Sequence, residues 1–175
     1  MKSEPGHRQA VHHRWPGFLC RSLPGRSLRR RWPCHGPGDE ITAENAVTRP
    51  DIIGHFDLII KNNAGGRLFD EESRQYRQAA LESLHRCLDT GAVFELNTGG
   101  IFRKYRSTPY PADFLLRELC AKHARMTINA DAHETAALRF WFDEALELLE
   151  TVGFGSVWVW ENGRIPGERP PGSRR

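Results

Sequence analysis

The sequence lacks any closely spaced pair of cysteines. Its four cysteines, Cys20, Cys34, Cys87 and Cys120, are far apart, which excludes a zinc ribbon and a redox C-x-x-C motif. Cys87 and Cys120 fall on the apolar faces of expected helices, where a free thiol packs as a small hydrophobic residue. Reduced cysteines are typical of the cytoplasm, so we expect a cytoplasmic protein.

Long hydrophobic runs are also missing. No stretch is long enough to span a membrane, and none has the unbroken apolar core of a secretory signal. We therefore expect no membrane partner. The 175 residues match the length of one ordinary domain with a sizeable core.

Acidic residues are scarce at the start of the chain. Residues 1–35 contain eight Lys and Arg but one acid, Glu4, so they carry +7; the whole chain carries +3, which leaves −4 for the rest. The mildly acidic remainder disfavours nucleic acid as a partner.

Residues 1–45 also lack apolar periodicity and are rich in Arg, Pro and Gly. We predict that they are an irregular, disordered leader, and that residues 166–175 are a flexible basic tail. A transit peptide or a nucleic-acid-binding arm is an alternative, but prolines at positions 5, 16, 24 and 33 interrupt an amphipathic helix. A further alternative is that this stretch was never a working part of the fold.

From about residue 46 to 165 the pattern alternates between strands and helices. Apolar runs predict strands at 51–54, 92–96, 125–130 and 156–160, and periodic stripes predict helices at 72–89, 111–123 and 134–152. Gly91 and Gly153 lie where helices commonly end. Short connections of this kind are typical of parallel βα units. We expect an α/β fold with four parallel strands and three helices, about half of a (β/α) barrel.

Side chains able to bind a metal follow two of these strands. His55 follows the first strand, and Asp131 and His133 follow the third. Residues two apart at a strand end can project to one side and offer an oxygen and an imidazole nitrogen. Barrel enzymes build metal sites at the carboxyl ends of their strands, so this pattern favours metal-dependent hydrolysis. His55 taken alone also fits a hydrogen-bonded structural histidine.

Other polar residues belong to the same expected edge. Glu95 and Asn97 share a face at the end of the second strand, where they either line a pocket or cap a neighbouring loop. Arg103 and Arg106 lie in the following loop, where a guanidinium can hold a phosphate by two hydrogen bonds. A charged loop is also compatible with a solvated surface.

Taken together, these motifs resemble the C-terminal part of histidinol-phosphate phosphatases of the polymerase-and-histidinol-phosphatase (PHP) superfamily. The resemblance covers residues 47–165 and rests on G-H-F-D at 54–57, E-L-N-T-G-G-I at 95–101, P-Y-P at 109–111 and D-A-H at 131–133. It implies a distorted (β/α)7 barrel, up to three divalent or iron-type metal ions (Mn, Zn or Fe), and hydrolysis of a small phosphorylated metabolite in histidine biosynthesis.

The resemblance also implies individual roles. His55, Asp131 and His133 correspond to metal ligands, Arg103 to a residue that grips the substrate phosphate, and Arg106 to a weaker candidate for that role. Glu95 and Asn97 correspond to pocket residues. Ala130 stands where the family commonly has Ser.

The His-x-His motif with which the family begins is absent, and with it most of the expected metal ligands. Three interpretations follow: a histidinol-phosphatase-type hydrolase, a non-enzymatic chain that is either an inactive truncated remnant or a fragment that needs its missing half in trans, or a PHP phosphoesterase with another substrate. An exposed barrel edge would also promote self-association.

Overall fold

The structure, a computed structural model, describes residues 9–10, 50–160 and 168–169 of the chain. Most of the predicted leader and tail lies outside these residues, so the disorder of 1–45 and of 166–175 remains a prediction. Within each of the two segments one short strand is described, β1 (Gln9–Ala10) and β6 (Glu168–Arg169).

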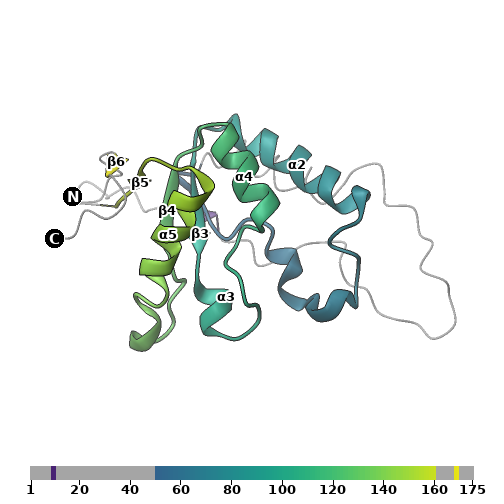
Figure 1. Ribbon diagram of the computed structural model, residues 1–175, viewed down its shortest axis with the longest axis horizontal. Helices are drawn as coiled ribbons and strands as arrows, with labels where there is room; N and C mark the ends of the chain where they lie inside the picture. The colour runs from purple at the N-terminus through teal and green to yellow at the C-terminus, as the bar shows by residue number, and fades with distance from the viewer. Residues whose placement is uncertain (1–8, 11–49, 161–167, 170–175) are drawn as a thin grey trace, which may run out of the picture.

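A parallel sheet organises the described residues. Its strands lie in the order β1, β2 (Ile52–Ile53), β3 (Val93–Asn97) and β4 (Met126–Asn129), and every neighbouring pair is parallel (Figure 1). Phe94 pairs with Met126 and Asn97 with Asn129, so β3 and β4 end at the same level. This confirms the predicted α/β class and places the two strand exits side by side.

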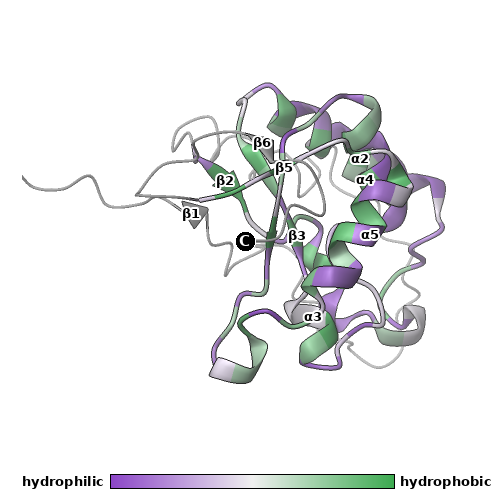
Figure 2. Ribbon diagram, turned by 60° about the vertical axis from the view of Figure 1, so that its left-hand side comes forward, coloured by the Kyte–Doolittle hydropathy of each residue, from purple (hydrophilic) through white to green (hydrophobic). Residues whose placement is uncertain are grey.

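The three main helices cover one face of this sheet (Figure 2). They are α2 (Arg74–Leu88), α4 (Asp113–Ala121) and α5 (Phe142–Val152), of which α2 and α4 lie close to their predicted positions. Each presents an apolar stripe, because its hydrophobic residues recur at helical spacing. The buried core between helices and sheet contains Leu84, Cys87, Phe94, Leu96, Leu115, Leu116, Leu119, Met126, Ala145 and Leu149.

The helix predicted over 134–152 is wrong in its first half. The α-helix begins only at Phe142, after a single 3-10 turn, η3 (Thr135–Ala137). Trp141 has a left-handed backbone, with φ 63°, which no α-helix can contain. Gly153, as predicted, ends the helix in the left-handed region, with φ 115°.

Short helical turns were not predicted at all. A four-residue helix, α3 (Gly99–Phe102), follows β3, and two 3-10 turns, η1 (Leu58–Asn62) and η2 (Ala64–Gly66), follow β2. Such segments are too short to show a period, and glycine weakens the helical signal further. They nevertheless shape the loops at the carboxyl edge of the sheet.

The fourth predicted strand does not join the parallel sheet. Residues Val157–Trp158 form β5, which pairs antiparallel with β6. Apolar alternation cannot distinguish parallel from antiparallel pairing, and a short connection such as residues 159–167 permits only the latter. The parallel sheet of the described residues is open, so the predicted partial barrel is confirmed only as an open α/β sheet.

None of the helices in the described residues is long and apolar enough to cross a membrane.

Candidate active site

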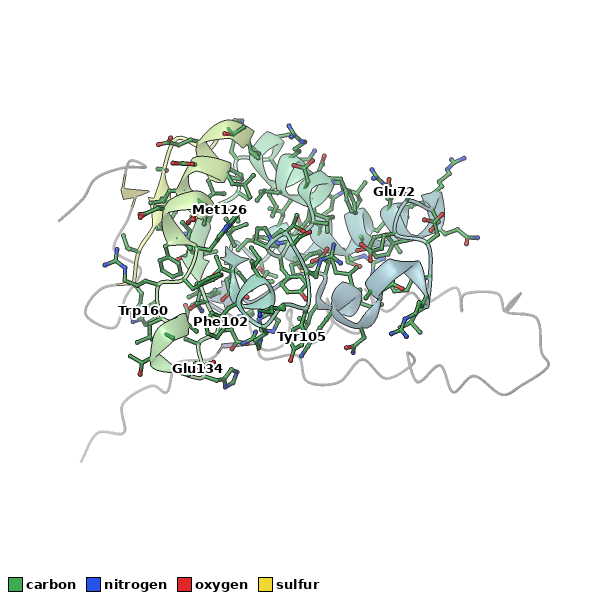
Figure 3. All side chains as sticks on the ribbon, turned by 60° about the horizontal axis from the view of Figure 1, so that its bottom comes forward. Glu72, Phe102, Tyr105, Met126, Glu134 and Trp160 are labelled. Atoms are coloured by element: carbon green, nitrogen blue, oxygen red, sulfur yellow. The ribbon has the colours of Figure 1, made fainter. Side chains whose placement is uncertain are left out.

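The candidate site lies at the carboxyl edge of the parallel sheet. The loop that follows β3 and the loop that follows β4 both reach this edge, and Figure 3 shows Phe102, Tyr105 and Glu134 in the lower part of the view, below Met126 in β4. Phe102 packs edge-on against Phe140, with ring centroids 5.2 Å apart. The two loops therefore contact each other directly.

Glu95 connects the exits of β2 and β3. Its side chain is buried, and its Oε2 accepts a hydrogen bond from the backbone N–H of His55 at 2.6 Å. The other carboxylate oxygen accepts from the Asn97 amide at 3.0 Å, and Asn97 Oδ1 accepts from the Gly99 N–H at 2.9 Å. These contacts join two strand ends and the start of α3 into one hydrogen-bonded unit.

His55 also faces Glu95 with its ring. The distance from Nδ1 to Glu95 Oε2 is 3.5 Å. The backbone of His55 has a positive φ of 25°, which is costly for a residue with a side chain. The structure thus brings His55, Glu95 and Asn97 together, as expected from the sequence.

Arg103 binds the residue that follows β4. Its Nη1 donates to the backbone carbonyl of Asp131 at 2.9 Å, and its Nη2 donates to Asp131 Oδ2 at 3.0 Å. Both side chains keep some contact with solvent, with 26% of the arginine and 42% of the aspartate exposed. A predicted phosphate-binding residue and a predicted metal ligand are therefore partners of each other.

His133 lies at the outer end of this group. Its Nε2 is 3.7 Å from Asp131 Oδ2, and its side chain is 78% exposed. The structure brings His133 near Asp131, but the distance is too long for a hydrogen bond.

Arg106 is directed elsewhere. It contacts Glu71, with Nη2 3.3 Å from Oε2, and it lines a shallow pocket of about 440 Å³ together with Tyr105 and Asn63. Arg106 therefore lies apart from the contact between Arg103 and Asp131. If it binds substrate, as predicted, it must do so from this neighbouring pocket.

The described residues do not fit the metal centre that the resemblance implies. No group of three His, Cys, Asp or Glu side chains able to hold a metal occurs in them, whereas a catalytic zinc ion typically has three protein ligands. Glu95 already accepts from His55 and Asn97, and Asp131 accepts from Arg103. As arranged, these carboxylates are used by protein partners.

Asp57 was not singled out from the sequence, although it ends the G-H-F-D motif. It is buried, its Oδ2 accepts from the Ala112 N–H at 3.1 Å, and its Oδ1 has no hydrogen-bond partner within the described part of the chain. Burial raises the pKa of Asp57 to about 8. The available sequence signal was an acidic residue at the end of a motif that already contained a candidate ligand.

Two tyrosines share this buried environment. The Tyr76 hydroxyl is 3.5 Å from Asp57 Oδ2, and burial raises its pKa. Burial likewise raises the pKa of Tyr110 to about 12. Both phenols therefore stay protonated at neutral pH.

The chemistry available at the edge is anion binding. A guanidinium has five N–H donors in a fixed plane, and Asp131 accepts from two of its nitrogens. The donors that remain suit a carboxylate or phosphate oxygen. The fold and this edge thus define an α/β protein with a polar, arginine-containing site at the carboxyl ends of parallel strands.

Similarity to a known protein agrees with that description. No family model matches the chain. The chain is 28% identical over 115 residues to a probable histidinol-phosphatase of Schizosaccharomyces pombe, and the match covers 65% of this chain and 37% of that protein. This distant similarity confirms the resemblance predicted from the motifs. The chain thus corresponds to little more than a third of the relative's length.

Proposed function

We propose that this chain acts on a small phosphomonoester, of the kind that histidinol-phosphatases hydrolyse, and that its described residues form the phosphate-holding side of the site. The observation that carries this proposal is the arrangement of Arg103 at the exits of β3 and β4. It is supported by the distant similarity to a probable histidinol-phosphatase. Under this proposal the enzyme class is a phosphoric monoester hydrolase, and the substrate is L-histidinol phosphate.

Arg103 would hold the phosphate through the donors that Asp131 leaves available. Charge-assisted hydrogen bonds of this kind are roughly twice as strong as those between neutral groups. Glu95 and Asn97 would shape the floor of the site, since each is buried and bonded to a strand exit or to α3. A partial (β/α)7 barrel around this edge belongs to the proposal as well.

The metal dependence of the related family needs more ligands than the described residues provide. The ligand roles predicted for His55, Asp131 and His133 remain predictions. We expect the 175-residue chain to bind phosphate but to hydrolyse phosphomonoesters slowly, because its described residues provide too few metal ligands. Each positioned electrostatic group that is missing commonly lowers a rate by about 10²-fold or more.

The test is an assay of the full chain with histidinol phosphate, with and without Mn²⁺, Zn²⁺ or Fe²⁺. The expected result is saturable phosphate binding and turnover well below ~1 s⁻¹, the lower end of ordinary enzyme rates. An Arg103→Ala variant should lose the binding, whereas Arg117→Ala, which removes an exposed arginine on α4, should keep it. Failure of the chain to bind any phosphate compound would refute the proposal.

A second candidate is a protein that binds phosphate compounds without hydrolysing them. It is favoured by one observation, namely that the carboxylates at the described edge already have protein partners. Phosphate binding with no turnover under any metal condition would select this candidate. Turnover of another phosphomonoester in preference to histidinol phosphate would retain the hydrolase class and change the substrate.

A further inference from the structure

The contact between Arg103 and Asp131 uses two different parts of the aspartate. One guanidinium nitrogen bonds the main-chain carbonyl and the other bonds the carboxylate, at 2.9 Å and 3.0 Å. Asp131 has a left-handed backbone, with φ 46°, and in this conformation its carbonyl oxygen and its Oδ2 face the same guanidinium. A flexible surface pair would not need the main-chain contact, so the geometry indicates a built support for the arginine.

Gly99 lies on the other side of the guanidinium, and its lack of a side chain leaves the space that the guanidinium occupies. A Cβ on Gly99 would lie 2.6 Å from Arg103 Nη2 and 2.3 Å from the carbonyl oxygen of Ala130. Both distances are shorter than any Cβ tolerates, so only glycine allows Arg103 to lie here. Gly99 begins α3, and its N–H is fixed by Asn97. The guanidinium thus lies between the end of β4 and the start of α3.

We propose that Asp131 is a positioning residue for Arg103, in place of the metal-ligand role that the resemblance implies. The aspartate holds one part of the guanidinium and leaves its other N–H donors to bind an oxyanion. This inference rests on the proposed function, because it assumes that Arg103 binds phosphate. It differs from that proposal in assigning the carboxylate to the arginine and not to a cation.

Three roles for Asp131 predict three different results. A positioning residue is needed for phosphate affinity, and an uncharged acceptor of the same shape can replace it. A carboxylate that merely blocks the arginine would raise phosphate affinity when it is removed. A metal ligand would release Arg103 whenever Mn²⁺ binds.

The first experiment measures binding of inorganic phosphate to the full chain by titration calorimetry. Asp131→Ala should weaken binding about tenfold, because a free guanidinium must be ordered at the moment of binding. Asp131→Asn should stay within about threefold of the wild type, because its amide oxygen accepts the same hydrogen bond. Asp113→Ala removes the aspartate of another Arg–Asp pair, the exposed one with Arg117 at 2.8 Å, and should leave the affinity unchanged.

The second experiment needs no variant that could fail to fold. In NMR spectra of the wild-type chain, the Arg103 guanidinium signals should shift on addition of phosphate and stay unchanged on addition of Mn²⁺ alone, apart from effects common to Arg117. Specific perturbation of Arg103 by Mn²⁺, or a rise in phosphate affinity in both Asp131 variants, would overturn the inference. If Arg103→Ala binds phosphate as the wild type does, the proposed function loses its phosphate site. If Arg103→Ala alone abolishes binding and Asp131→Ala does not weaken it, only the role of Asp131 is wrong.

Discussion

The two faces of β3 are equally buried, but one carries apolar side chains and the other carries polar ones. Phe94 and Leu96 belong to the apolar core beneath the helices. Glu95 and Asn97, which alternate with them, are only 1% exposed and make hydrogen bonds to His55 and Gly99. One five-residue strand therefore has a face that serves packing and a face that serves the strand exits.

The difference lies in how each face tolerates change. An apolar contact is shared among many neighbours, and its loss is felt in proportion to the volume removed. A buried carboxylate has a few specific donors, and each donor left unpaired carries its own cost. Substitutions on the helix-side face should therefore reduce stability alone, whereas those on the other face should also disturb the phosphate site.

The largest expected effect is on the helix-side face. Phe94→Ala should lower the free energy of unfolding by about 3–5 kcal/mol, because it leaves a cavity in the core. Urea denaturation at pH 7 measures this loss, and Leu138→Ala, at a side chain that is 58% exposed, is the control. If the variant folds at low temperature, its phosphate affinity should match the wild type; a changed affinity would break the distinction between the faces.

Glu95→Ala tests the opposite face. It leaves the His55 N–H and the Asn97 amide without their acceptor, which should cost about 2–3 kcal/mol of unfolding free energy. Glu95→Gln keeps one acceptor oxygen and should cost less. Phosphate binding should weaken in both variants, measured by calorimetry. An unaltered affinity in a destabilised Glu95→Ala protein would show that this face also serves stability alone.

Asp57 extends the comparison to pH. Because the folded pKa is about 8, above the ordinary value of 3.8, the folded state retains a proton that the unfolded chain loses. The proton on Asp57 therefore contributes to the free energy of unfolding. This contribution is complete below about pH 4, declines by up to about 1.4 kcal/mol per pH unit as the pH rises, and is lost above pH 8. Thermal unfolding from pH 5 to 9 measures this decline.

The matched variant is Asp57→Asn, which keeps an acceptor for the Ala112 N–H and cannot ionise. It should be less sensitive to pH than the wild type, and its stability relative to the wild type should increase steadily as the pH rises from 5 to 8. Arg106, Glu71 and Tyr76 surround Asp57, so the difference between variant and wild type is the informative quantity. Identical pH profiles would mean that Asp57 is ionised in the folded protein.

The smallest expected effect is at the outer edge of the site. His133→Ala should change the free energy of unfolding by less than about 0.5 kcal/mol, because the side chain is 78% exposed. Phosphate affinity should also change little. A loss of Mn²⁺ binding in this variant, measured by electron paramagnetic resonance, would instead restore the metal-ligand role predicted for His133.

Periodicity was enough to predict the helix-side half of the molecule. The apolar stripes located α2 and α4, and the alternation of strands and helices predicted the parallel sheet. The strand exits were also predictable, because a polar residue after an apolar run marks them. His55 and Asp131, which come shortly after β2 and β4, were placed at the carboxyl edge by this pattern.

Pairing partners were not predictable from the same patterns. Nothing in the spacing shows that Arg103 meets Asp131 and not a ligand, or that Arg106, three residues later, faces Glu71. The left-handed turn at Trp141 removed half of a predicted helix, because a hydropathy pattern carries no information on φ. The antiparallel pairing of β5 depends on residues beyond the apolar run that predicted it.

The left-handed backbones of His55, Asp57 and Asp131 have a practical consequence. Glycine would relieve this conformation by about 1 kcal/mol, and at His55, whose bond to Glu95 comes from the backbone N–H, a search for thermostable variants should select it; at Asp57 and Asp131 glycine would also remove a hydrogen-bonded carboxylate. Such a gain would delete a side chain from the strand exits. In a mutational screen, positions where the substitution that raises stability also removes a side chain needed for binding would mark the binding site. Such a screen needs no known substrate.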